Sequence, residues 1–79
     1  MKATVLVRPK SGILDPQGEA VGSALEHLGF AVKDARVGKV IDLDVEATDA
    51  AEAKAKVESM CEQLLANPLI ESYEVEIEP

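Results

Sequence analysis

The amino-acid sequence predicts an α+β domain whose elements follow the order β-α-β-β-α-β. Several short segments alternate apolar and polar residues, which is typical of strands with one buried face. Two longer segments carry apolar residues three or four positions apart, which is typical of amphipathic helices. A sheet and two helices of this kind can bury their apolar sides against each other in two layers.

The strand pattern is clearest at the two ends of the chain and just after its middle. The predicted strands are residues 2–8, 30–37, 40–47 and 72–78. In residues 40–47 the alternation would point Ile41, Leu43 and Val45 inward. Gly38 and Lys39 would form the turn between the second and third strands.

The first helix is predicted over residues 15–28, with Asp15 capping its N-terminus and Gly29 providing a left-handed C-cap. Its buried stripe would comprise Ala20, Val21, Ala24, Leu25 and Leu28. The second helix would begin at Thr48 or Asp49, with Glu52 completing a capping box, and end before Pro68. Its buried stripe would comprise Ala50, Ala53, Val57, Met60, Cys61 and Leu64.

Right-handed crossovers would assemble these elements into a ferredoxin-like fold. In that fold a four-stranded antiparallel sheet carries both helices on one face, and residues 1–79 form a single domain. The opposite face of the sheet would be open and would include the apolar residues Leu6 and Val40. A small aliphatic core and an open sheet favour a homo-oligomer, which we expect to be a dimer or tetramer.

Composition and charge disfavour several classes of protein function. Fifteen acidic and eight basic residues give a net charge of −7, which disfavours nucleic acid and anionic membranes as partners. The apolar run at residues 3–7 is too short for a signal peptide or a membrane span. A single cysteine, Cys61, excludes an internal disulfide and Cys-rich metal sites. We therefore expect a cytoplasmic protein.

The loop between the first strand and the first helix is the strongest candidate for a binding site. Basic residues, two large aliphatic residues and a capped helix N-terminus follow one another there, although an ordinary connection would explain the same residues. The candidate partner-interface residues are Arg8, Lys10, Ile13, Leu14, Asp15, Gln17, Gly18 and Lys39.

The other reactive side chains have simpler structural interpretations. His27 suits a helix C-terminus, and Cys61 lies on an apolar stripe. Asp42, Asp44 and Glu46 alternate as expected on a solvated strand face, although such a ladder could hold a divalent cation. We expect no catalytic residue, no metal ion and no cofactor in this chain.

Two segments of the sequence resemble the PurS family, the small subunits of phosphoribosylformylglycinamidine synthase. The first is Gly-Ile-Leu-Asp-Pro-Gln-Gly at residues 12–18, and the second is Cys-Glu-Gln-Leu-Leu-Ala-Asn-Pro at residues 61–68. The similarity continues at residues 24–25, 28–29, 37–39 and 70–74, so the resemblance extends over essentially the whole chain.

The resemblance implies a non-catalytic subunit of an ATP-dependent, glutamine-using ligase complex in de novo purine biosynthesis. Its partners would be a glutaminase subunit and a large ATP-binding synthetase subunit, and it would assist their assembly and the transfer of ammonia between them. The sequence agrees, since it has no cysteine–histidine pair suited to a glutaminase and no phosphate-binding loop. The alternative is an ACT-like amino-acid-sensing domain, which shares the element order and binds ligands near the corresponding loop.

Overall fold

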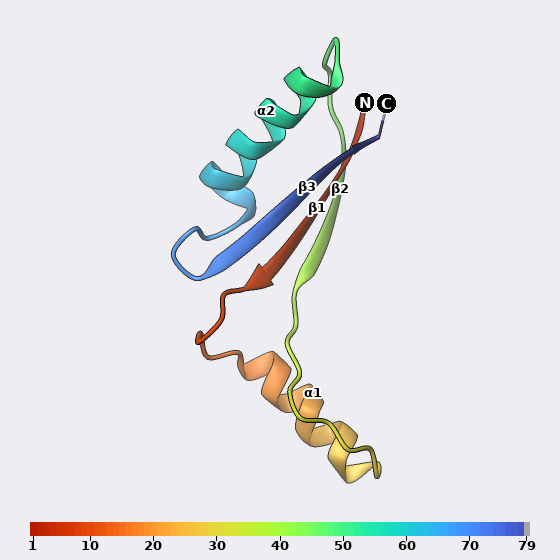
Figure 1. The fold of residues 1–79 in the computed structure, drawn as a ribbon, viewed down its shortest axis with the longest axis vertical. Helices are drawn as coiled ribbons and strands as arrows, with labels where there is room; N and C mark the ends of the chain where they lie inside the picture. The colour runs from red at the N-terminus through yellow and green to blue at the C-terminus, as the bar shows by residue number, and fades with distance from the viewer. Residues whose placement is uncertain (79) are drawn as a thin grey trace.

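The computed structural model describes residues 1–78, in which three strands form one antiparallel sheet (Figure 1). The central strand is β1, and the order across the sheet is β2-β1-β3. The elements are β1 (Lys2–Pro9), α1 (Pro16–His27), β2 (Lys39–Asp44), α2 (Ala50–Met60), the π-helical turn η1 (Cys61–Leu65) and β3 (Glu71–Glu78). The predicted α+β class and five of the six predicted elements are therefore present.

The prediction of a four-stranded sheet is wrong. Residues 30–37 form no strand and instead run back along α1 toward β2 (Figure 1). Lys33 and Asp34 interrupt the apolar alternation of this segment. In addition, the backbone N–H of Val37, which a strand would use in its ladder, donates to the Asp15 carboxylate at 2.8 Å. The segment is therefore held against the helix rather than beside another strand.

The expectation that both helices cover one sheet face is also wrong. Among the helices of residues 1–78, α2 packs on the sheet, where it contacts β3 and β1, whereas α1 extends beyond the end of the sheet (Figure 1). The molecule measures 50 × 24 × 14 Å and has a radius of gyration of 15.7 Å. A compact domain of this length would have a radius of about 12 Å. The chain thus leaves one of its helices outside the core.

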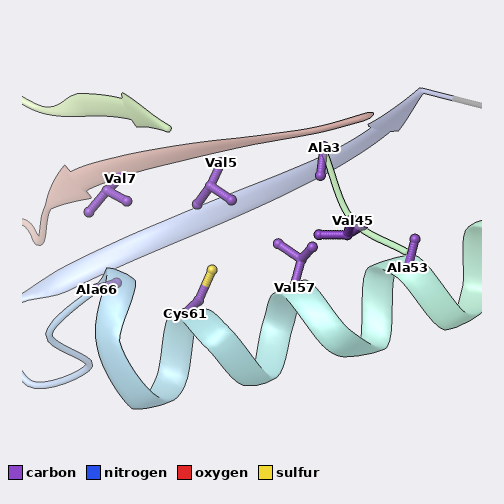
Figure 2. Packing of buried hydrophobic residues seen from close by; sticks show 8 residues of the cluster. All are labelled: Ala3, Val5, Val7, Val45, Ala53, Val57, Cys61 and Ala66. Atoms are coloured by element: carbon purple, nitrogen blue, oxygen red, sulfur yellow. The ribbon is translucent and has the colours of Figure 1, made fainter. Parts of the chain in front are cut away.

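The core lies between α2 and the inner face of the sheet (Figure 2). β1 contributes Ala3, Val5 and Val7, which alternate with outward-facing residues as predicted. The remaining members of the core are Val45, Ala53, Val57, Cys61 and Ala66. Side chains of β3 at alternate positions are half-buried against this cluster, as predicted for Tyr73, Val75 and Ile77.

The predicted burial of Leu64 is wrong, because its side chain is 84% exposed. The cause is the π-helical turn η1, in which the N–H of Ala66 donates to the carbonyl of Cys61, five residues earlier, at 3.0 Å. This wider turn shifts the inward-facing positions by about one residue. Leu65 and Ala66 consequently face the core where a regular α-helix would have placed Leu64.

The predicted caps of α2 are present. The Asp49 carboxylate accepts from the N–H of Glu52 at 2.8 Å. The Glu52 carboxylate in turn accepts from the backbone N–H of Thr48 at 3.1 Å and from the Thr48 hydroxyl, and it pairs with Lys56 at 3.1 Å. The hydroxyl of Thr48 is the main cause that lowers the pKa of Glu52 from 4.5 to about 2.

α1 also ends as predicted. Gly29 has φ of +95°, and its N–H donates to the carbonyl of Glu26 at 3.0 Å, while the N–H of Phe30 donates to that of Leu25 at 3.0 Å. These two bonds form a Schellman motif, which turns the chain back along the helix. The return of residues 30–37 along α1 follows from this turn.

The buried side of α1 differs from the prediction. Of the expected stripe, Leu25 is half-buried, and the exposed members are Ala20, Val21, Ala24 and Leu28. The helix instead presents Gly18 and Gly22 to the returning chain at Ala35. An apolar face of α1 therefore remains uncovered within residues 1–78.

We predict that Val57→Ala lowers the free energy of unfolding by about 2 kcal/mol, because the side chain is fully buried between α2 and the sheet. Leu64→Ala is the matched control and should change it by less than about 0.5 kcal/mol. Urea denaturation followed by circular dichroism measures both. A larger cost for Leu64→Ala would contradict the shifted register of η1.

We predict that Glu52 stabilises the fold above pH 4.5 and that this contribution disappears as the pH falls toward 2. The folded-state pKa is lowered, so the stabilising charge is lost on acidification through that pKa. The measurement is the difference in unfolding free energy between the wild type and Glu52→Gln from pH 6 to pH 2. A difference that stays constant over this range would refute the role of the Glu52 charge.

Candidate partner-binding site

The Asp15 carboxylate joins three segments at one point. One oxygen accepts from the N–H of Gly18 at 3.1 Å, which caps α1, and the other accepts from the N–H of Val37 at 2.8 Å. The Val37 bond is the main cause that lowers the pKa of Asp15, followed by the Gly18 bond. Asp15 thereby ties the β1–α1 loop and the start of α1 to the chain that enters β2.

Two glycines permit the close approach of backbone segments at this junction. A Cβ on Gly18 would lie 2.2 Å from the carbonyl oxygen of Ala35. A Cβ on Gly38 would lie 2.3 Å from the carbonyl oxygen of Val7. Both contacts are too short for any side chain, so these positions require glycine.

Lys10 links the same loop to the turn before β3. Its backbone N–H donates to the carbonyl of Ile70 at 2.9 Å, and its ammonium donates to the carbonyl of Pro68 at 2.6 Å. Its own carbonyl accepts from Nη2 of Arg36 at 2.8 Å. The ammonium of Lys10 therefore stabilises the loop, and the guanidinium of Arg36 is hydrogen-bonded to the same loop.

Three cationic residues line a hollow of about 320 Å³ at the end of the β1–β2 pair, namely Arg8, Arg36 and Lys39. Leu6 and Val40 contribute apolar surface to it; the other lining residues are Val7, Pro9 and Gly38. All three cationic side chains are exposed. We call this feature the basic hollow.

The remaining candidates belong to the β1–α1 loop and the start of α1. Leu14 is 73% exposed, Gln17 is exposed, and Ile13 is half-buried. A second hollow of about 320 Å³ includes Ile13, Leu14 and Asp15 together with Arg36. Gly18 is buried and belongs to the support of the site rather than to its surface.

The structure therefore brings Arg8 and Lys39 together, although 31 positions separate them in the sequence. Sequence reasoning missed Arg36, which lines both hollows. Its segment was expected to be a strand, where an arginine is unremarkable. The predicted turn at Gly38 is absent, since Lys39 already belongs to β2. The available signal for Arg36 is that it is a cation two residues before Gly38 in an acidic chain.

The reactive side chains occupy structural positions. Cys61 is buried, and burial raises the pKa of its thiol. Nδ1 of His27 lies 2.8 Å from the carbonyl oxygen of Ser23, one turn earlier in α1. The hydroxyl of Tyr73 donates to Glu62 at 2.7 Å, which raises the pKa of Tyr73 to about 12.

Residues 1–78 contain no group of three or more His, Cys, Asp or Glu side chains placed to hold a metal ion. None of their helices is long and apolar enough to cross a membrane.

Comparison with known proteins identifies relatives along nearly the whole chain. The family model PurS, described as phosphoribosylformylglycinamidine (FGAM) synthase, matches residues 2–79. The subunit PurS of FGAM synthase from Methanocaldococcus jannaschii is 44% identical, covering 98% of this chain and 94% of that protein. The corresponding subunit from Bacillus subtilis is also 44% identical, covering 98% and 92%.

Solved structures agree with these relatives. Crystalline B. subtilis PurS superposes with a TM-score of 0.87 at 43% identity, covering 99% of this chain and 98% of that one. A chain in the structure of PurLQS from Thermotoga maritima superposes with a TM-score of 0.86 at 42% identity, covering 95% and 93%. The comparisons give no support to an ACT-like sensor. The chain belongs to the PurS family of FGAM synthase subunits.

Proposed function

We propose that this chain is the small, non-catalytic subunit of FGAM synthase in purine biosynthesis and joins the glutaminase subunit to the ATP-dependent synthetase subunit. The observation that carries this proposal is the match to PurS over residues 2–79, together with the related chain in PurLQS. In this role the chain assists assembly of the complex and the transfer of ammonia between its partners. A cytoplasmic location is part of the proposal, because the complex uses ATP and glutamine.

The shape of the molecule supports a bridging role. The sheet with α2 and the protruding α1 occupy opposite ends of a body 50 Å long (Figure 1). The basic hollow and the exposed Leu14 lie in the region that connects them. Two different partners can therefore contact this chain at the same time without overlapping.

The uncovered apolar surface supports a homo-oligomer, as a dimer or tetramer. Leu28 is 72% exposed and Phe30 is 60% exposed on α1 and the turn that follows it. On the sheet, the helix α2 packs on β1 and β3 and leaves the half-buried Ile41 and Leu43 of β2 less covered. The apolar face of α1 from one copy can cover Ile41 and Leu43 on the sheet face of another copy. This contact would complete both cores.

We predict that the isolated chain has at least the mass of a dimer in light scattering at micromolar concentration. Leu28→Lys should shift it toward the monomer, because the substitution places a charge in the apolar face while a cation suits the end of a helix. Lys54→Gln on α2 is the control and should leave the mass unchanged. A monomeric wild type would contradict the proposed self-association.

We also predict that the tagged chain retains a glutaminase and a synthetase subunit from its own organism, and that FGAM formation from glutamine requires all three. Leu14→Ala should preserve stability, because the side chain is exposed. It should accelerate dissociation from the partners about fivefold or more, as expected for an interfacial aliphatic anchor. Full glutamine-dependent activity without this chain would refute the proposed role.

A further inference from the structure

We propose that the basic hollow binds the carboxylates of an extended acidic segment from a partner subunit. The proposal rests on the proposed function, because the partner is a subunit of the same complex. The basic hollow is defined by the cations Arg8, Arg36 and Lys39 around Leu6 and Val40. It would therefore select a segment in which acidic and aliphatic side chains lie close together.

The charge distribution makes this hollow unusual for the chain. Three of eight basic residues line it, although the chain as a whole has a net charge of −7. Within residues 1–78 Arg8 forms a single ion pair, with Glu74 at 3.9 Å, and both side chains are exposed. Such an exposed pair is worth little, so Arg8 is available to another carboxylate.

Arg36 is held in place before any partner arrives. Nη2 donates to the carbonyl of Lys10 at 2.8 Å, and the next residue, Val37, is fixed by the Asp15 carboxylate at 2.8 Å. Within the described residues this bond engages one guanidinium N–H, and the other N–H donors can bind a carboxylate in the bidentate manner. Preorganisation of this kind lowers the entropic cost of binding.

The neighbouring strand provides a backbone surface for an extended segment. β2 is an edge strand of the sheet, so one side of its backbone has no strand partner within residues 1–78. An added strand can pair with such an edge, and side chains at alternate positions then supply specificity. Asp42 and Asp44 occupy the far end of β2 and would repel acidic residues there, so the acidic residues of the partner must lie at the Lys39 end.

A second copy of this chain fits the hollow less well. A two-fold contact centred on the hollow would bring the same three cations face to face, and like charges repel. α1 has an exposed apolar face, as in stable self-association, whereas the hollow is rich in charge, as at the rim of contacts between different proteins. The acidic segment is therefore assigned to a partner subunit.

The direct test uses the isolated chain and the synthetic peptide acetyl-Glu-Leu-Glu-Leu-Glu-amide, with NMR detection of backbone and guanidinium signals. Saturable shifts are expected at Arg8, Arg36 and Lys39. R36Q and K39Q should each weaken binding roughly fivefold to tenfold at low salt, and the matched control K54Q should not. Absence of saturable shifts, or equal weakening by K54Q, would overturn the proposal.

A second arm measures association with the glutaminase and synthetase subunits at two salt concentrations. R36Q and K39Q should weaken association and reduce its salt dependence, while K54Q behaves as the wild type. If the wild type assembles and R36Q and K39Q assemble equally well, the hollow is not a partner site and the proposed function stands. If the wild type does not assemble, the proposed function fails. The peptide titration then tests carboxylate binding by the basic hollow on its own. A lower mass of isolated R36Q in light scattering would make the hollow a self-contact and overturn the proposal.

Discussion

The arrangement of this molecule depends on the two hydrogen bonds that the Asp15 carboxylate accepts. One bond begins α1 through the N–H of Gly18, and the other holds the N–H of Val37. Because the same side chain makes both bonds, the helix and the chain that returns from it must lie together beyond the end of the sheet. The absence of a strand at residues 30–37, the position of Arg36 and the direction of α1 all follow from this constraint.

The stable core and the exposed apolar surface involve different helices, namely α2 for the core and α1 for part of the exposed surface. α2 and the sheet bury aliphatic residues of modest size, such as Val5, Val7 and Val57, and supply the core (Figure 2). α1 contributes little to that core and keeps Leu28 exposed. The apolar face of α1 is therefore accessible within residues 1–78.

Local sequence features predict some parts of the candidate site and miss others. The position of Asp15 before Pro16 predicts a helix cap, and the structure confirms this role. The position of Lys39 beside Arg8 and the contribution of Arg36 could not be read from spacing, since they depend on the pairing of β1 with β2 and on the return of residues 30–37. Lys10 has the right charge, yet its ammonium bonds to the carbonyl of Pro68 within its own chain.

Local sequence patterns are sufficient to predict most of the elements and the family. Caps at Asp15 and Asp49, the positive φ at Gly29 and the alternation in β1, β2 and β3 are set by neighbouring residues, and local chemistry predicts them. Which apolar faces are covered depends instead on long-range packing. The apolar residues of α1 have the spacing of a buried helix, so the sequence predicts burial. Spacing cannot show whether the same chain supplies a surface that covers them. Leu64 shows the same limit, since the π-helical turn at Cys61 shifts the register of side chains that a regular helix would keep.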